Sequence, residues 1–295
     1  ASSKNNLDEK VRTDPPVDNE NDYYIAPKRK VVTNSSKMRM RTNFTPSLEL
    51  VTIAISTSNL QVHYGQTLAL AGVDLEVPKG SLLSVIGPNG AGKSALLNAL
   101  AGTVEVSDGT VTIEGGTPAL VLQATQVDRS LQMTVRDVVS LARYYRKGLL
   151  KRFRASDRDT VQDSLKRMSI EHLAHSQFHE LSGGERQRVL VAQGLAQDAD
   201  VLLLDEPING LDIVSRSLIL DAIEEEKSVG KTVVVTTHNL DDARNSNQVL
   251  LLCTSPCCVG SPHEVLTEEH LNDAFRGQHI RVGQSLIVED PHHAH

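Results

Sequence analysis

The stretch that decides the fold runs Leu82-Leu83-Ser84-Val85-Ile86, then Gly87-Pro88-Asn89-Gly90-Ala91-Gly92-Lys93-Ser94. The first five residues form a short apolar run typical of a buried strand, and residues 91–101 are typical of a helix that stops at Gly102. The eight residues at the junction fit G-x-x-x-x-G-K-[ST]. Glycines there let backbone N–H groups approach phosphate oxygens, and the helix N-terminus adds partial positive charge. The pattern predicts a phosphate site in which Lys93 reaches the β- and γ-phosphates and Ser94 binds Mg²⁺.

A second apolar run ends in two acidic residues. Val201-Leu202-Leu203-Leu204 is followed by Asp205-Glu206-Pro207. A buried parallel strand would deliver these carboxylates to the same edge of the sheet as the phosphate loop. Asp205 suits the Mg²⁺ shell, and Glu206 can polarise an attacking water molecule.

A third motif is Leu181-Ser182-Gly183-Gly184-Glu185-Arg186-Gln187. A serine and two glycines at a helix start make a second anion-binding end, which does not fit the same phosphate within one chain. The three motifs together resemble those of ATP-binding cassette (ABC) ATPases, and the resemblance runs from about Ala54 to Val288. In that family, the signature motif of one subunit caps the γ-phosphate held by the other subunit. The resemblance therefore implies a head-to-tail homodimer with ATP between the subunits.

The remaining landmarks of the family occur in its order. Tyr64 matches the aromatic residue that stacks on adenine, and Gln123 matches the glutamine that touches Mg²⁺ and lies beside the membrane-domain contact. Asn209-Gly210-Leu211-Asp212 matches the D-loop, which crosses the dimer interface, and His238 matches the histidine that contacts the γ-phosphate. Ala95 replaces the serine or threonine usual after Ser94, so one hydrogen bond to the α-phosphate is lost.

The resemblance thus implies a full set of site residues. The catalytic residues are Glu206, His238 and Gln123; the signature contacts to the partner's ATP are Ser182, Gly183, Gly184 and Glu185; Asp212 lies at the dimer interface; and the Mg²⁺ ligands are Ser94, Gln123 and Asp205. The ATP-binding residues are Tyr64, Gly87, Pro88, Asn89, Gly90, Ala91, Gly92, Lys93, Ser94 and Ala95. The cofactors implied are ATP and Mg²⁺.

Alternating strand and helix patterns predict an α/β fold with a mostly parallel sheet. The resemblance makes this a P-loop NTPase fold of the ABC nucleotide-binding type, with an N-terminal antiparallel β subdomain and an inserted helical lobe at about 124–190. The predicted strands and helices are Val51–Ile55, Leu60–His63, Ala69–Val77, Leu82–Ile86, Ala91–Ala101, Thr110–Glu114, Ala119–Leu122, Val135–Tyr145, Asp157–Met168, Gly184–Ala196, Val201–Leu204, Ile213–Lys227, Thr232–Thr236, Leu240–Ser246 and Val249–Cys253.

Residues 1–48 differ in charge and composition from the rest of the chain. Residues 1–48 carry 9 basic and 6 acidic side chains and few apolar ones, which predicts a disordered leader. Residues 49–290 form the expected ATPase domain, and residues 291–295 form a His-rich tail. The net charge of −7 gives no reason to expect a nucleic-acid partner.

The spacing of the motifs narrows the kind of ABC protein. Only 58 residues separate Gln123 from Ser182, too few for the long coiled coils of chromosome or repair types, and there is one cassette rather than two. No stretch has 18 consecutive apolar residues, so a membrane permease would be a separate chain. We expect a peripheral subunit on the cytoplasmic face of the cell membrane that binds a permease and works indirectly with a solute-binding protein.

Two stretches bear on the substrate. Gln126-Val127-Asp128, Met133–Val139 and Arg143-Tyr144 resemble the manganese, zinc and iron-chelate importer branch. Leu181–Leu211, which contains Val191-Ala192-Gln193-Gly194, is most similar to zinc importer ATPases. Uptake of a divalent metal ion is therefore predicted, with zinc favoured and manganese or iron open. The alternatives are a siderophore or cobalamin importer, an exporter, and a soluble ABC ATPase without a membrane partner.

Overall fold

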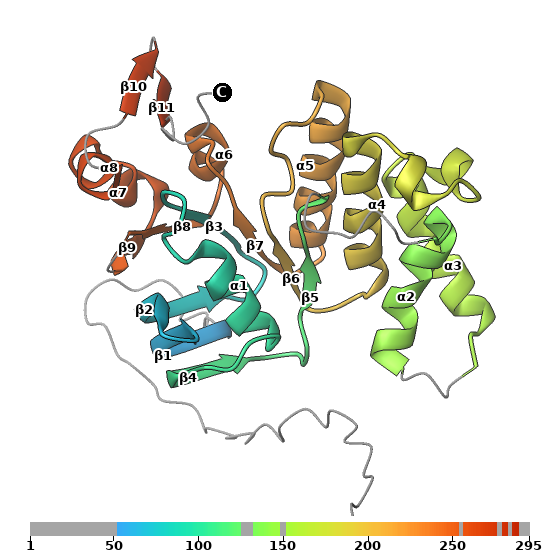
Figure 1. The fold of residues 1–295 in the computed structure, drawn as a ribbon, viewed down its shortest axis with the longest axis horizontal. Helices are drawn as coiled ribbons and strands as arrows, with labels where there is room; N and C mark the ends of the chain where they lie inside the picture. Colours follow the sequence, from blue (N-terminus) through green and yellow to red (C-terminus); the bar gives the residue numbers. More distant parts are fainter. Residues whose placement is uncertain are drawn as a thin grey trace, which may run out of the picture. The chain divides into compact units, whose positions relative to one another are not determined.

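The computed structural model describes residues 52–124, 132–147, 152–253, 256–275, 279–282 and 285–288 (Figure 1). The predicted leader (1–48), the Gln126-Val127-Asp128 stretch and the His-rich tail (291–295) lie outside these residues. None of the helices within the described ranges has the length and apolar character needed to cross a membrane.

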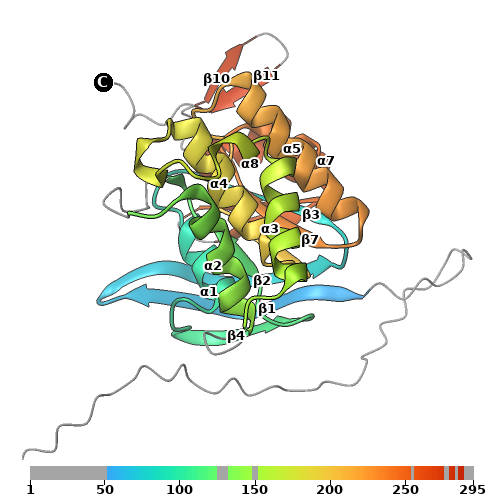
Figure 2. The same cartoon turned by 90° about the vertical axis from the view of Figure 1, so that its right-hand side faces the viewer.

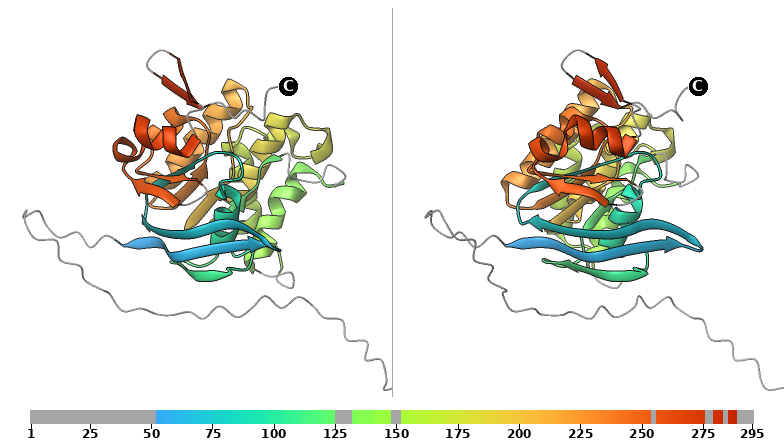
Figure 3. Two further views of the ribbon diagram at one scale, coloured as in Figure 1. Left: turned by 60° about the vertical axis from the view of Figure 1, so that its left-hand side comes forward. Right: turned by 90° about the vertical axis from the view of Figure 1, so that its left-hand side faces the viewer.

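A three-stranded antiparallel sheet forms one layer, visible in Figure 3. It contains β1 (Ile53–Tyr64), β2 (Thr67–Pro78) and β4 (Asp108–Ile113) in the order β2-β1-β4. The antiparallel β subdomain is thus present, but the two strands expected over Val51–Ile55 and Leu60–His63 are one. The register shifts between Thr57 and Leu60, and Asn59 has a φ of 47°. This irregularity interrupts the apolar alternation without ending the strand.

A six-stranded sheet forms the centre of the domain, in the order β5-β6-β7-β3-β8-β9. Five of these strands are parallel to one another, namely β5, β6, β7, β3 and β8, and β9 is antiparallel to β8. Their bounds are β3 Leu82–Ile86, β5 Ala119–Val121, β6 Val201–Leu204, β7 Thr232–Thr236, β8 Gln248–Leu252 and β9 Pro256–Gly260. The predicted α/β fold with a mostly parallel sheet is confirmed, since β3, β6 and β7 are buried along their whole length as central parallel strands usually are.

The two faces of this sheet pack against different layers. In β6, Val201 and Leu203 join the cluster that contains α1 (Lys93–Ala101) and the antiparallel sheet. Leu202 and Leu204 join the other cluster, which contains residues of α2 (Val135–Lys147), α3 (Ala155–Arg167), α4 (Gly183–Ala196) and α5 (Ile213–Ser228). Because successive side chains of a strand point to opposite faces, α1 lies on one face of the sheet and α4 on the other. The helical layer comes forward in Figure 2.

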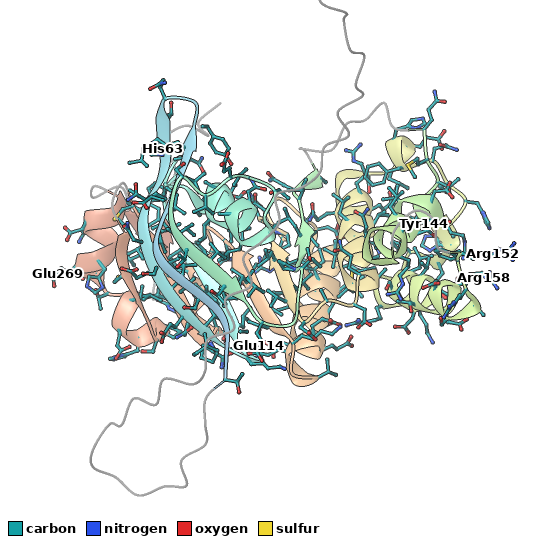
Figure 4. All side chains as sticks on the ribbon, turned by 90° about the horizontal axis from the view of Figure 1, so that it is seen from below. His63, Glu114, Tyr144, Arg152, Arg158 and Glu269 are labelled. Carbon is teal, nitrogen blue, oxygen red and sulfur yellow. The ribbon has the colours of Figure 1, made fainter. Side chains whose placement is uncertain are left out.

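The helical lobe follows β5. It contains α2 (Val135–Lys147), α3 (Ala155–Arg167), two short 3₁₀ helices (Glu171–Leu173 and Phe178–Glu180) and the start of α4 (Gly183–Ala196). Tyr144, Arg152 and Arg158 mark it in Figure 4, whereas His63 marks the β1–β2 hairpin. Inside the lobe, Arg143 Nε lies 3.1 Å from Asp157 Oδ1, and Arg143 also donates to the Ala196 carbonyl at 2.9 Å. This buried ion pair joins α2 to α3 and α4.

The last part of the chain holds elements that the sequence analysis did not anticipate. After α5 (Ile213–Ser228) and α6 (Leu240–Arg244) come β9, α7 (Pro262–Val265), α8 (Glu268–Phe275), β10 (His279–Val282) and β11 (Ser285–Val288). Helices α6, α7 and α8 pack on Ile86 of β3 and on Val249 and Leu251 of β8. Helix α6 matches the segment predicted over Leu240–Ser246, whereas α7 and α8 are short, so their apolar periodicity was too brief to recognise.

Candidate nucleotide-binding site

The glycine-rich loop passes close to two other backbone segments. Gly87 has a φ of 152° and Gly92 a φ of 96°, both in the region that glycine favours. A Cβ on Gly87 would collide with the carbonyl oxygen of Leu252, and one on Gly92 with that of Ala69. The glycines of the motif are therefore required by tertiary contacts as well as by the turn.

Helix α1 begins at the end of this loop. It starts at Lys93, two residues later than predicted, because the left-handed Gly92 is its N-cap. The backbone N–H groups of the first helical residues have no acceptor within the helix, and the helix dipole adds positive charge there. Ser94 is exposed, whereas the side chain of Ala95 is packed in the core. Because alanine has no polar side-chain group, Ala95 can offer only its backbone N–H to a phosphate.

Lys93 folds back over the loop. Its Nζ donates to the carbonyl oxygens of Gly87 at 2.8 Å and Pro88 at 3.1 Å, and the residue is 6% exposed. The loop thus holds a buried cation beside the orphan amides of the helix start. Such a cluster of donors is suited to an anion such as a phosphate group.

Asp205 and Glu206 follow β6, as predicted. Asp205 is 4% exposed, its N–H donates to the Val121 carbonyl at 2.9 Å, and its Oδ1 accepts from Thr236 Oγ1 at 2.8 Å. Glu206 has a φ of 45°, and its N–H donates to the same Thr236 Oγ1 at 2.7 Å. A non-glycine residue in this region is strained, and such strain is typical of functional sites.

The Glu206 carboxylate contacts His238, which follows the neighbouring strand β7. Its Oε1 lies 2.5 Å from His238 Nε2, and its Oε2 accepts from Asn209 Nδ2 at 3.2 Å. The hydrogen bond with His238 is the main influence that lowers the pKa of Glu206, with smaller contributions from Asn209 and the charge of Lys93. Glu206 is therefore held ionised at neutral pH.

Gln123 lies two residues after β5, in a loop tied to the signature helix. The N–H of the next residue, Ala124, donates to Gln187 Oε1 at 2.8 Å, and Gln187 is 3% exposed. The loop of Gln123 and helix α4 are thus connected directly. Gln187 belongs to the third sequence motif, but no role was assigned to it there.

The signature motif caps α4. Ser182 Oγ accepts from the Glu185 N–H at 3.3 Å, and Glu185 Oε2 accepts from the N–H and Oγ of Ser182 at 2.9 and 2.7 Å. The hydrogen bond from the Ser182 hydroxyl is the largest influence that lowers the pKa of Glu185, and the hydrogen bond from the Ser182 N–H is the next. Ser182 and Gly183 are exposed, and a Cβ on Gly183 would meet open space. This helix start is accessible to a second molecule.

Asp212 caps the neighbouring helix α5. Its Oδ1 accepts from the Ser215 N–H at 2.9 Å and its Oδ2 from Ser215 Oγ at 2.7 Å, which lowers the pKa of Asp212. A Cβ on Gly184 would lie 3.0 Å from Asp212 Oδ2. The signature glycine and the D-loop aspartate are therefore neighbours within one chain, with Asp212 exposed.

Tyr64 lies apart from the central sheet, at the end of β1. It pairs with Thr67 in the β1–β2 hairpin and is 49% exposed. The hairpin continues into Ala69, the residue whose carbonyl approaches Gly92. The exposed ring is thus carried by the strand pair that borders the phosphate loop.

The strand order brings the chemical groups together. The phosphate loop follows β3, His238 follows β7 and Asp205-Glu206 follow β6, and these three parallel strands are adjacent. Their carboxyl ends therefore share one edge, where ligands bind in open α/β sheets. The predicted Mg²⁺ ligands Ser94, Gln123 and Asp205 offer hydroxyl, amide and carboxylate oxygens, which fit that cation. The hydrogen bond from Thr236 to Asp205 Oδ1 fixes the orientation of this carboxylate.

Sequence reasoning missed two residues that contact the acidic pair. Asn209 was assigned only to the D-loop, and Thr236 was read only as the end of a strand. Thr236 ends β7 and precedes His238 by two residues, so both residues lie at the same end of that strand. This signal was present in the sequence, but its meaning depends on β6 lying beside β7.

The fold and this edge define a P-loop nucleotide-binding protein. Residues 70–209 match the family model described as ABC transporter. A probable metal transport system ATP-binding protein of Chlamydia trachomatis is 36% identical over 76% of this chain and 89% of its own length. The manganese transport system ATP-binding protein MntB of Bacillus subtilis is 34% identical over 80% and 97%. The zinc transport system ATP-binding protein TroB of Treponema pallidum is 33% identical over 82% and 94%.

Solved structures show the same architecture. A structure described as a metal-chelate type ABC transporter in an inward-facing conformation is 28% identical, with a TM-score of 0.70 over 80% of this chain and 96% of that chain. A bacterial ABC transporter cassette solved as a dimer is 25% identical, with a TM-score of 0.63 over 70% and 98%. This chain therefore belongs to the ABC transporter family. It is an ABC-type ATPase, as the resemblance predicted.

Proposed function

We propose that this chain is the ATP-hydrolysing subunit of an importer for a divalent transition metal ion. The observation that carries the proposal is the convergence of Lys93, the Asp205-Glu206 pair and His238 at one edge of the sheet. The names of the relatives point to manganese and zinc as cargo. We retain both metals as candidate cargo: zinc, which the signature region favours, and manganese.

The proposed reaction is attack of water on the γ-phosphorus, with release of ADP and phosphate. Lys93 and the amides at the start of α1 would hold the phosphates and offset charge that develops in the transition state. Glu206 would accept a hydrogen bond from the attacking water, because its carboxylate stays ionised and is aimed by His238 and Asn209. Bound Mg²⁺ would supply charge neutralisation, held by Ser94, Gln123 and Asp205.

We propose that the active form is a homodimer. The helix starts at Lys93 and Ser182 both offer anion-binding ends, but α1 and α4 lie on opposite faces of the sheet. The exposed Ser182 and Gly183, with the half-buried Gly184 and Glu185, would therefore contact the ATP held by a second copy. Asp212, exposed beside Gly184, would lie at that interface. Tyr64 would stack on the adenine of the ATP bound in its own chain.

The proposed setting is the cytoplasmic face of the cell membrane. There the dimer would bind integral permease subunits and serve, indirectly, a solute-binding protein, without a nucleic-acid partner. The relatives named as components of metal transport systems support this setting.

Cellular metal content tests the proposal. Zinc, manganese and iron would be measured by mass spectrometry in metal-limited cells that lack the gene and in cells rescued with wild type or E206Q. A selective fall in zinc or manganese that only the wild type restores is expected. Unchanged zinc and manganese, with ATPase activity intact in the purified protein, would reject metal import and leave the ATPase assignment standing.

A further inference from the structure

One buried hydroxyl joins the two acidic residues of the site. Thr236 is completely buried at the end of β7, and its Oγ1 lies 2.8 Å from Asp205 Oδ1 and 2.7 Å from the Glu206 backbone nitrogen. Neither contact is to a neighbour in the chain, since 31 and 30 residues separate the partners. The hydroxyl thus bridges from β7 to the end of β6.

The chemistry of the groups fixes the direction of both hydrogen bonds. An ionised carboxylate can only accept, and a backbone N–H can only donate. Thr236 must therefore give its single proton to Asp205 Oδ1 and accept from the Glu206 N–H. Because that proton is committed to Asp205 Oδ1, the hydrogen bond fixes the orientation of the Asp205 carboxylate.

The second hydrogen bond supports a strained backbone. Glu206 has a φ of 45°, a conformation that non-glycine residues keep only when their surroundings hold it. The Thr236 hydroxyl accepts from the N–H of that residue, while His238, two residues after the end of the strand, contacts its carboxylate at 2.5 Å. One strand end therefore holds Glu206 at both its backbone and its side chain.

We propose that Thr236 is a positioning residue for ATP hydrolysis, which orients Asp205 toward the metal ion and Glu206 toward the attacking water. This inference rests on the proposed function. It predicts that loss of the hydroxyl weakens the response to Mg²⁺ and slows turnover, even when the fold and nucleotide binding without Mg²⁺ survive.

The test compares T236V, T236S and T232V in the full chain. Valine keeps the shape and removes both hydrogen bonds, whereas serine keeps the hydroxyl. T232V is the matched control, because Thr232 is equally buried on β7 and accepts only the remote Gly80 N–H at 3.0 Å. The readouts are kcat and KM for ATP, and binding of a fluorescent non-hydrolysable ATP analogue titrated with Mg²⁺.

In T236V we expect kcat to fall at least about tenfold, and the Mg²⁺ concentration for half-maximal analogue binding to rise several-fold, because preorganised polar groups contribute on this scale. T236S should retain most of the wild-type kcat and Mg²⁺ response, and T232V should equal wild type in both measurements. If T236V does not fold, T236A is compared with T236S instead. Both variants lack the methyl group of threonine, and they differ only in the hydroxyl.

Two results would overturn the inference. One is a wild-type kcat and Mg²⁺ titration in T236V (or in T236A, if that variant is needed). The other is equal loss in T236S and the hydroxyl-free variant, which would indicate packing alone. With E206Q inactive in the same assay, either result would leave the proposed ATPase function standing, whereas a wild-type protein without ATPase activity would reject that function instead.

Discussion

Glu206 Oε1 and His238 Nε2 lie 2.5 Å apart, although 32 residues separate them in the chain. The pair forms because β6 and β7 are neighbours in register, with Leu204 beside Val235. The same contact lowers the pKa of Glu206 and aims its carboxylate along the sheet edge.

E206Q should keep ATP binding and lose hydrolysis. Glutamine has nearly the same shape but is a far weaker proton acceptor, so turnover should fall by about 100-fold or more. With ATP and Mg²⁺ present, gel filtration should show a stable dimer of E206Q, because the nucleotide that holds the interface is not consumed. Turnover at the wild-type rate would remove Glu206 from the proposed role.

Acidification should narrow the stability difference between wild type and E206Q. The folded pKa of Glu206 is lowered below its ordinary 4.5, chiefly by the hydrogen bond with His238. Its ionised form therefore stabilises the fold above the unfolded pKa, and this contribution is lost as pH falls through the folded value. Urea unfolding at about pH 7 and about pH 3 checks this linkage. A difference that stays constant or widens in acid would contradict it.

R143M should destabilise the helical lobe. Asp157 is completely buried, and R143M removes both the cation 3.1 Å from its Oδ1 and the hydrogen bond to the Ala196 carbonyl. The expected loss is about 3 kcal/mol in the free energy of unfolding, measured by urea denaturation. R152M, at an exposed arginine of the same lobe, is the control and should change stability by less than about 0.5 kcal/mol. An equal loss of unfolding free energy in R143M and R152M would mean that the buried ion pair stabilises the fold no more than an exposed arginine does.

G87A should disturb both stability and ATP binding. Gly87 and Gly116 have φ values of 152° and 101°, so alanine is strained at either position, by about 1 kcal/mol or more. Only at Gly87 would the new Cβ collide with a backbone oxygen, that of Leu252. We therefore expect G87A to lose a further ~2 kcal/mol and to bind ATP more weakly than wild type, with G116A as the matched control. Thermal unfolding and nucleotide titration would detect this, and indistinguishable variants would refute it.

Much of the site could be predicted from residue spacing. The phosphate loop, the acids after β6 and the signature motif are contiguous segments, so their chemistry can be recognised along the chain. Helix caps are local too, and Ser182 and Asp212 cap α4 and α5 through residues three positions away. The pattern failed where tertiary contacts override it, as in β1, which continues through the irregularity at Asn59.

The contacts among the catalytic groups could not be predicted in this way. Thr236 looks like any β-branched residue of a buried strand, and Asn209 looks like a turn residue. Asn209 contacts Glu206 across a local turn of the chain. The role of Thr236 comes from Asp205 and Glu206, which follow the neighbouring strand β6, and the choice of neighbouring strands depends on packing across the whole sheet.

The sequence by itself determined which reactive groups the protein has and which local elements carry them. These are short-range properties, encoded in glycine positions, caps and apolar runs. Only the tertiary structure decided that β6, β7 and β3 are adjacent, and so which groups meet. Strand order is set by the burial of both sheet faces, with α1 and the antiparallel sheet on one side and α4 and α5 on the other. That packing brings Lys93, Asp205, Glu206, Thr236 and His238 to one edge.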